Sequence, residues 1–188
     1  ASRGSLRIIG GQWRGRKLDI VDLEGLRPTA NRIRETLFNW LQTDIGLSYC
    51  LDLYAGTGAL GLEAASRGAR QVTLLEVNQQ AAKQLQTHRD ALDAGQCQVI
   101  NTTAMGFLGQ NQQQYDIVFI DPPYQDNAWS EVAQQLMSTQ ALKDEALIYI
   151  EYPTAIDAPE LPQQWQLLKE KKAGAVQYAL YQHTKDIR

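Results

Sequence analysis

The chain has 188 residues, of which 44% are hydrophobic, and a formal net charge of −3. This length suits one α/β domain with a small appendage, and the hydrophobic content is ample for a packed core. No apolar run approaches the roughly 20 residues that span a bilayer, which argues against a membrane protein. Cys50 and Cys97 form neither a disulfide framework nor a metal-type cluster, which favours a reducing, cytoplasmic environment and no metal site. His88 and His183 have no ligand set near them in the sequence, and both are expected at the surface.

The charge is unevenly distributed along the chain. Residues 1–34 hold eight basic and three acidic side chains, a net charge of +5, whereas residues 35–188 hold ten basic and eighteen acidic ones, a net charge of −8. This asymmetry predicts that one end of the molecule meets a polyanion. A solvated N-terminal segment without a partner is the alternative explanation.

The first predicted element is a short hairpin over residues 7–18. Gly10 and Gly11 supply a turn with positive φ, and residues 12–18 form the returning strand. Trp13 stands among four basic residues, Arg7, Arg14, Arg16 and Lys17. Aromatic and cationic side chains interleaved in this way suit base stacking and phosphate contact. An anchor that packs the hairpin on the domain is an equally good explanation of Trp13.

A turn over residues 25–29 leads into a predicted helix whose apolar residues recur at helical spacing between residues 33 and 41. Thr29 or Asn31 is the expected cap. Three arginines gather at its amino end: Arg27, Arg32 and Arg34. Because the helix dipole disfavours cations there, this cluster predicts a bound anion. Local ion pairs of Arg34 are the alternative.

From residue 50 onward, predicted strands and helices alternate. Strands are expected at 50–54, 72–76, 98–101, 117–121 and 146–151, and helices near 59–67, 79–93, 104–109 and 128–140. This alternation predicts a parallel sheet with helices on both faces. Two final runs, 165–171 and 176–181, predict a closing antiparallel hairpin, which a standard dinucleotide-binding domain lacks.

A glycine loop follows the first of these strands. Gly56, Gly58 and Gly61 match G-x-G-x-x-G, in which glycine lets the backbone approach a ligand closely. Glu76 ends the next strand, where its carboxylate can accept hydrogen bonds from both hydroxyls of a ribose. NAD and S-adenosylmethionine both fit these features. Asp52 favours S-adenosylmethionine, because a buried acid needs a partner and would repel a pyrophosphate.

A second loop, Asp121-Pro122-Pro123-Tyr124, follows the strand at 117–121. The two prolines remove amide donors, so the backbone presents mainly carbonyl acceptors, and the Asp121 carboxylate adds more. Such acceptors fit the exocyclic NH₂ of a planar substrate on which Tyr124 can stack. Transfer from a sulfonium needs in-line positioning more than a strong base, and Asp121 can take the released proton. A rigid loop that merely closes the strand is the alternative.

Both loops follow strands of the predicted parallel sheet, so they are expected to face each other at its carboxyl edge. This arrangement predicts an enzyme that holds a methyl donor against an amino group. An NAD-dependent oxidoreductase on the same glycine loop is disfavoured by Asp52 and by the proline loop. A non-catalytic RNA-binding module is disfavoured by the presence of both loops.

Several blocks together resemble the bacterial RsmD family. Asp121-Pro122-Pro123-Tyr124 resembles the Asn/Asp-Pro-Pro-Tyr/Phe signature of methyltransferases that act on planar amino or amide nitrogens. Residues 7–16, 26–29 and 32–39 carry further similarity, so the resemblance covers nearly the whole chain. It implies a class I methyltransferase fold: a Rossmann-like, mostly parallel seven-stranded sheet with a C-terminal antiparallel hairpin. A small N-terminal β-hairpin extension over residues 1–28 would precede the methyltransferase domain at 29–188.

The resemblance also implies an activity, transfer of a methyl group from S-adenosylmethionine to N2 of a guanine in 16S ribosomal RNA, with S-adenosylhomocysteine as the product. The small ribosomal subunit or an assembly intermediate would be the substrate. The alternative keeps the fold and donor but methylates a DNA amino group or a protein glutamine amide. A monomer is expected, because the basic face needs no partner chain.

The site residues expected on these grounds form three groups. The cofactor would contact Asp52, Tyr54, Ala55, Gly56, Thr57, Gly58, Gly61, Glu76, Val77, Ala104 and Met105. The target guanine would contact Asp121, Pro122, Pro123 and Tyr124, and the RNA would contact Arg7, Trp13, Arg14, Arg16, Lys17, Arg27, Arg32 and Arg34. One position departs from the wider pattern. Thr103 stands where an Asp often reads the adenine, so Ala104 and Met105 are expected to replace it.

Overall fold

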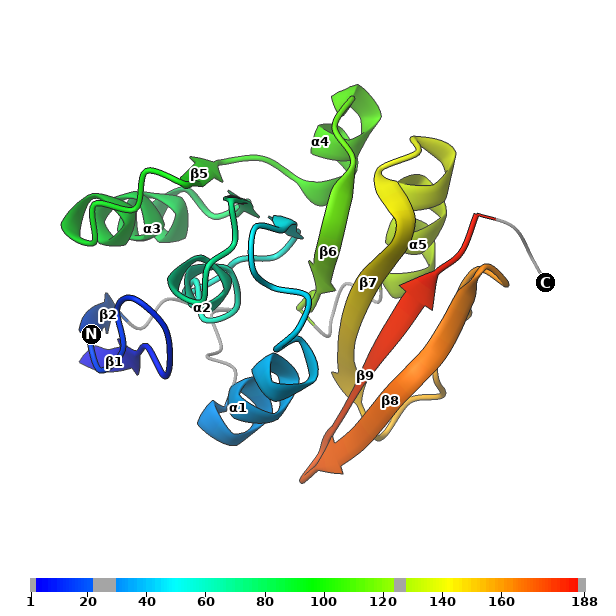
Figure 1. Cartoon of the computed structure of the whole chain (residues 1–188), viewed down its shortest axis with the longest axis horizontal. Helices are drawn as coiled ribbons and strands as arrows, with labels where there is room; N and C mark the ends of the chain where they lie inside the picture. Colours follow the sequence, from blue (N-terminus) through cyan, green and yellow to red (C-terminus); the bar gives the residue numbers. More distant parts are fainter. Residues whose placement is uncertain (1–2, 22–29, 124–127, 186–188) are drawn as a thin grey trace.

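A seven-stranded sheet forms the centre of the protein in the computed structural model (Figure 1), which describes residues 3–21, 30–123 and 128–185. In sheet order the strands are β5 (Cys97–Ile100), β4 (Gln71–Leu75), β3 (Tyr49–Asp52), β6 (Tyr115–Ile120), β7 (Leu142–Pro153), β9 (Val176–His183) and β8 (Trp165–Ala173). Strands β5 to β7 are parallel, and β9 is antiparallel to both β7 and β8. The predicted sheet and its closing hairpin are confirmed.

The strand order reverses between β3 and β6. The chain runs outward from β3 through β4 to β5 and then returns to β6 on the other side of β3. Asp52, the last residue of β3, pairs with Phe119 in β6. Asp121 therefore lies only two residues beyond the partner of Asp52. Ligands of open α/β sheets bind at such a reversal, outside the carboxyl ends of the strands.

Five helices of the described ranges cover the two faces of the sheet. Helices α1 (Asn31–Trp40), α2 (Gly61–Ser66) and α3 (Gln79–Ala91) pack on one face, and α4 (Ala104–Gln110) and α5 (Trp129–Ser138) pack on the other. Neighbouring strand residues alternate between the faces: Cys50 joins the first core and Leu51 the second. None of these helices combines the length and the apolar character that crossing a membrane requires.

The N-terminal hairpin differs from its prediction. Its strands are β1 (Arg3–Arg7) and β2 (Lys17–Val21), which pair in antiparallel register, and residues 8–16 form a long connection. The expected tight turn at Gly10 and Gly11 is therefore wrong. Buried apolar residues of both strands and of the connection belong to the core under α1 to α3: Leu6, Ile8, Trp13, Leu18 and Ile20. Figure 1 shows the hairpin beside α2 and α3.

Two expected local features are corrected. Helix α1 has Ala30 as its cap with no side-chain hydrogen bond, and Asn31 is its first residue; Thr29 lies outside the described residues. His88 and His183 are buried rather than exposed. The His88 Nε2 atom lies 2.9 Å from the carbonyl oxygen of Asp19, so this histidine connects α3 to the hairpin.

Candidate active site

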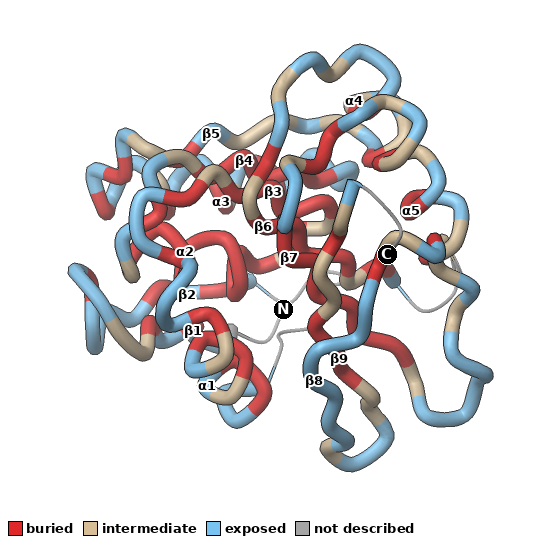
Figure 2. Tube along the Cα trace, turned by 45° about the vertical axis from the view of Figure 1, so that its right-hand side comes forward, coloured by how far each residue is buried: buried red, intermediate tan, exposed pale blue. Residues whose placement is uncertain are grey.

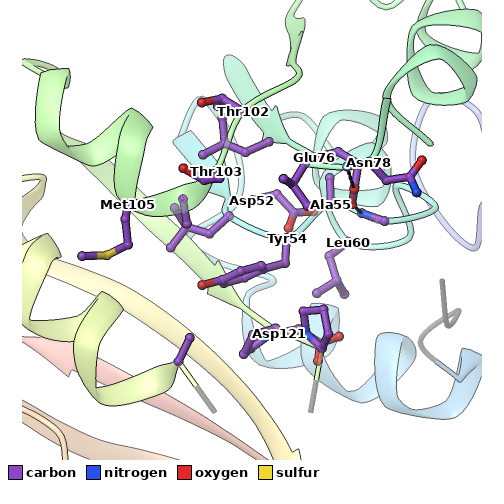
Figure 3. Close-up of a pocket in the computed structure, with 18 of the residues that line it drawn as sticks. Asp52, Tyr54, Ala55, Leu60, Glu76, Asn78, Thr102, Thr103, Met105 and Asp121 are labelled. Atoms are coloured by element: carbon purple, nitrogen blue, oxygen red, sulfur yellow. Dashed lines mark hydrogen bonds between the residues drawn. The ribbon is translucent and has the colours of Figure 1, made fainter. Parts of the chain in front are cut away.

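A cavity of about 580 Å³ opens at the carboxyl edge of the sheet. Its walls come from the ends of β3, β4, β5 and β6 and from the start of α5. Figure 3 shows Asp52, Glu76 and Asp121 at this cavity, where they come from the ends of β3, β4 and β6. Its volume lies within the range of small-molecule and cofactor sites. The structure therefore places the two loops singled out in the sequence around one space.

Of the eleven cofactor residues expected from the sequence, nine line the cavity: Asp52, Tyr54, Ala55, Gly56, Thr57, Glu76, Val77, Ala104 and Met105. Gly58 and Gly61 do not. A Cβ on Gly58, where φ is +89°, would lie 2.7 Å from side-chain atoms of both Leu62 and Leu85. Both glycines allow close packing of the loop and of α2.

Gly61 fixes the buried carboxylate of Asp52. The Gly61 N–H donates to Asp52 Oδ2 at 3.0 Å. A Cβ at Gly61 would lie 2.5 Å from Leu74 Cδ2 and 3.1 Å from Asp52 Oδ2. Glycine at this position therefore lets α2 approach the sheet and present its amide to Asp52.

Burial dominates the electrostatics of Asp52. Desolvation raises the pKa of this carboxyl to about 7, and the nearby Glu76 adds to the increase. The backbone N–H groups of Gly61 and Tyr54 oppose the shift but do not cancel it. A cation in the cavity would favour the ionised form of Asp52, since an opposite charge at short range stabilises a carboxylate.

Glu76 joins the end of β4 to the glycine loop. Its Oε1 accepts from the Gly56 N–H at 3.1 Å and its Oε2 from the Asn78 N–H at 2.6 Å. Asn78 in turn caps α3, because its side chain accepts from the Ala81 N–H. These bonds fix the carboxylate at the cavity wall. Each of its oxygens keeps a further lone pair for a ligand hydroxyl.

The wall beyond Glu76 is largely apolar, with Leu75 and Met105 among its residues. Thr103 also lines the cavity, and its hydroxyl accepts from the Gly106 N–H at 3.0 Å and caps α4. Val77 lies at this wall and is 65% exposed. A slot between apolar side chains suits a flat ring system.

The proline loop closes the opposite side. Asp121, Pro122 and Pro123 line the cavity, with Pro122 buried and Asp121 half-buried. Tyr124, the fourth expected residue, lies outside the described residues. Asp121 and Asp52 thus contribute carboxylates to one cavity from neighbouring strand ends.

Sequence reasoning missed several cavity residues: Leu60, Asn78, Thr102, Ala128 and Glu131. Asn78 had a signal, because Asn before a helical run marks a cap beside the expected ribose acid. Nothing in the sequence marked Glu131, which lines the cavity because the first turn of α5 lies beside it.

The predicted RNA-binding residues separate into three groups. Five basic side chains are exposed: Arg7, Arg14, Arg16, Lys17 and Arg32. Arg27 lies outside the described residues. Trp13 is buried, and its backbone N–H donates to the Ser66 hydroxyl at 3.0 Å, so the structure favours the anchoring role for this side chain.

The prediction for Arg34 is wrong, because its guanidinium is buried and cannot reach RNA. It donates to the Arg7 carbonyl at 2.7 Å and to the Asn31 side chain at 2.8 Å. It also lies 3.4 Å from the carboxylate of Glu63, in a buried ion pair. Burial lowers the pKa of Arg34, and the charge of Glu63 opposes that shift.

Glu63 also holds the connection of the hairpin. Its two carboxylate oxygens accept from the N–H groups of Ile9 and Gly10, each at 2.9 Å. Ser66, one turn later in α2, donates its hydroxyl to the Gly10 carbonyl at 2.6 Å. The helix that follows the glycine loop therefore also positions the basic hairpin.

The chain matches the model of a protein family and is similar to two ribosomal RNA methyltransferases. The family model described as "Conserved hypothetical protein 95" matches residues 6–182. "Ribosomal RNA small subunit methyltransferase D" of Escherichia coli (strain K12) is 49% identical over 179 residues, which cover 95% of this chain and 90% of that protein. The protein of the same name from Haemophilus influenzae is 47% identical over 187 residues, covering 97% and 96%.

A solved structure is similar over the same extent. "Putative methyltransferase yhhF from Escherichia coli" superposes with a TM-score of 0.91 at 46% sequence identity. The match covers 97% of this chain and 100% of that one. The likeness therefore includes both the sheet and the N-terminal hairpin.

Proposed function

The chain belongs to the family of ribosomal RNA small subunit methyltransferase D, and on this premise we propose that it methylates N2 of a guanine in 16S ribosomal RNA, with S-adenosylmethionine as donor. Family membership makes the chain a methyltransferase with the class I fold expected from the sequence. The observation that carries the proposal is the single cavity shared by Asp52, Glu76 and Asp121.

The residues of the cavity fit S-adenosylmethionine. The buried carboxylate of Asp52 matches the positive amino-acid end of the cofactor, and the fixed carboxylate of Glu76 matches its ribose hydroxyls. The apolar slot beside Met105 matches the adenine ring. When bound, this cofactor supplies an electrophilic methyl group on a sulfonium.

The proline loop supplies acceptors for the target amino group. The Asp121 carboxylate and nearby carbonyls accept from its two N–H groups, which directs the nitrogen lone pair toward the methyl group. Positioning of this kind lowers the barrier without a strong base, and Asp121 takes the released proton directly or through water. The guanine must leave its stack to enter the cavity, and Tyr124 would stack on it there.

The exposed basic residues of the hairpin and of α1 would bind the surrounding RNA phosphates. Arg14 and Arg16 stand in the connection that Glu63 and Ser66 hold, so their positions are fixed relative to the glycine loop. Affinity for RNA would then be largely electrostatic and would fall with salt. We further propose a monomer that acts in the cytoplasm, where the buried free thiols of Cys50 and Cys97 would stay reduced.

The test is methyl transfer from labelled S-adenosylmethionine to small ribosomal subunits from cells that lack this protein. Naked 16S RNA, duplex DNA and a glutamine-containing protein are assayed beside them. We expect label in N2-methylguanine on the subunits. Label on DNA or protein alone would overturn the proposed substrate.

Two variants make this assay specific. Asp121→Ala removes the acceptor at the cavity and should abolish labelling while cofactor binding persists. Asp44 is an exposed acid at the opposite edge of the sheet. The Asp44→Ala variant should methylate the subunits as the unaltered protein does. Equal activity of the two variants would contradict the role of Asp121.

A further inference from the structure

A second group of basic residues lies on β8, the outermost strand of the sheet. Residues 166–172 of this strand are all exposed, as Figure 2 shows in pale blue. Its second half carries three lysines: Lys169, Lys171 and Lys172. Its first half instead carries Leu167 and Leu168, which are 45% and 43% exposed.

Strand register places the lysine end of β8 at the edge of the sheet that carries the cavity. Ile120, Ile150, Ala179 and Glu170 form one row across β6, β7, β9 and β8. The next row toward the carboxyl edge therefore holds Asp121 and Lys171. Three strand spacings separate them, about 14 Å. Figure 1 shows the end of β8 and helix α1 on the same side of the molecule, beyond the carboxyl ends of β6 and β7.

The register also gives the face on which these lysines stand. Lys169 pairs with Leu180 and Lys171 with Tyr178, and both partners belong to the core under α1. Directly opposed residues of an antiparallel pair share a face, so both lysines project toward α1. Tyr178 stacks on Trp40 of α1 at 5.4 Å between ring centroids. Lys171 thus stands next to the end of a helix whose other end carries exposed Arg32.

The exposed lysines of this face form no ion pair within the described part of the chain, and Glu151 of β7, the acid in the same row as Lys171, is buried. Neither Lys169 nor Lys171 has an acidic partner within 4.0 Å there. Glu170, the acid between them, pairs with Ala179 of the other core and projects to the opposite face.

Protection of an exposed strand edge explains lysines in general but not this distribution. Lysine on an edge strand prevents pairing with another chain. That purpose would be served best near the exposed leucines 167 and 168, yet the charge is concentrated at the end nearest the cavity. Position relative to the cavity therefore accounts for the lysines better than edge protection does.

We propose that Lys169 and Lys171 bind phosphates of the RNA on the side of the cavity opposite the N-terminal hairpin. The target guanine would then be held by RNA contacts on both sides: the hairpin next to α2 and α3, and the lysine face of β8 (Figure 1). This inference rests on the proposed function, and it identifies a contact surface that the basic N-terminal segment does not include.

The test uses the full chain with Lys169 and Lys171 both changed to Glu (K169E/K171E), which keeps the edge strand charged. The control reverses two other exposed lysines, Lys83 of α3 and Lys185 beyond β9, and changes the net charge equally (K83E/K185E). Binding of unmodified small subunits is measured over a salt series with S-adenosylhomocysteine present. We expect at least tenfold weaker binding for K169E/K171E, and little change for the control.

The salt series gives a second readout. Since each phosphate contact contributes about 0.7 to 0.9 to the slope of log affinity against log salt, a neutral K169Q/K171Q variant should reduce that slope by about 1.4 to 1.8. A K169R/K171R variant should restore binding, and S-adenosylhomocysteine affinity should be unchanged throughout. The neutral and arginine variants also test the proposal should the reversed variant fail to fold.

Equal weakening of K169E/K171E and K83E/K185E, or binding as tight as that of the unaltered chain, would overturn the inference. Neither result would contradict the proposed function, provided that the unaltered chain methylates the subunits. Failure of the unaltered chain to label subunits would instead reject the proposed function itself.

Discussion

The guanidinium of Arg34 and the carboxylate of Glu63 lie 3.4 Å apart, and both side chains are buried. Arg34 belongs to α1 and Glu63 to α2, so the pair connects two helices that pack on the same face of the sheet. Both side chains also bind backbone atoms of the hairpin and its connection, at Arg7, Ile9 and Gly10. The pair therefore joins the N-terminal hairpin to the helix that follows the glycine loop.

Removal of Arg34 should destabilise the protein strongly. Arg34→Ala leaves the Arg7 carbonyl without its donor and Glu63 with Arg67 as its remaining guanidinium partner, at 2.8 Å. Loss of a buried charged donor of this kind typically costs about 1 to 3 kcal/mol of the free energy of unfolding. Urea denaturation measures this loss. Arg32→Ala, two residues away but exposed, is the matched control and should change stability by less than about 0.5 kcal/mol. Similar losses in both variants would contradict the assigned role of the pair.

The high pKa of Asp52 should make stability depend on pH. The pKa rises from 3.8 to about 7 on folding, so between these values the native protein holds a proton that the unfolded chain releases. The free energy of unfolding should therefore fall as pH increases from about 4 to about 7, by up to about 4 kcal/mol, and level off above pH 7. Asp52→Asn should flatten this dependence, as urea denaturation at several pH values would show. An unchanged profile in the variant would count against the burial of Asp52 as its cause.

The Asp52 carboxyl should also make cofactor affinity depend on pH, and affinity should rise with pH where stability falls. Only the ionised carboxylate attracts the amino group of S-adenosylhomocysteine, and its fraction rises through pH 7. Affinity measured by calorimetry should therefore increase about tenfold between pH 6 and pH 8. Asp52→Asn should bind more weakly and lose this dependence; a variant that retains the pH profile would refute the assignment.

Substitution of Gly61 should disturb the cavity through packing. The Cβ of Gly61→Ala would lie too close to Leu74 and would press on the Asp52 carboxylate. Overpacking of this kind typically costs about 1 to 3 kcal/mol, and we expect cofactor affinity to fall as well. Gly95→Ala adds a Cβ with nothing within 4 Å at an ordinary φ and is the control. Thermal unfolding and calorimetry distinguish the two variants.

Charge reversal in the connection of the hairpin should weaken RNA binding alone. Arg14 and Arg16 are exposed, so Arg14→Glu with Arg16→Glu should leave the fold and the affinity for S-adenosylhomocysteine unchanged. Binding to small subunits should weaken at least tenfold, with a smaller salt slope. Unchanged RNA affinity would show that the hairpin does not contact the substrate.

Local sequence patterns were sufficient to predict the sheet and most of the residues that line the cavity on the side of Asp52 and Glu76. Apolar runs that include Asp52 or end in Glu76 and Asp121 marked three parallel strands, and parallel strands bring their carboxyl ends together. The lack of an acid at Thr103 was also visible, and the structure assigns that hydroxyl to the cap of α4.

Contacts distant in the chain explain what the sequence did not reveal. Arg34 appeared to be a surface cation because its partner Glu63 lies 29 positions later in the chain. Gly10 and Gly11 resembled a tight turn, yet hydrogen bonds from α2 hold them inside a longer connection. Lys169 and Lys171 carry no motif, and only the strand register places them at the edge of the sheet that carries the cavity.

The hydrogen bonds of Glu63 and Ser66 have a consequence for protein engineering. Residues 8–16 depend on acceptors and donors that α2 provides, so the hairpin is not a transferable RNA-binding module. A chimera that grafts this hairpin onto another methyltransferase would need Arg34, Glu63 and Ser66 at the equivalent positions. Directed evolution of substrate choice in this scaffold would accordingly have to change the hairpin and α2 together.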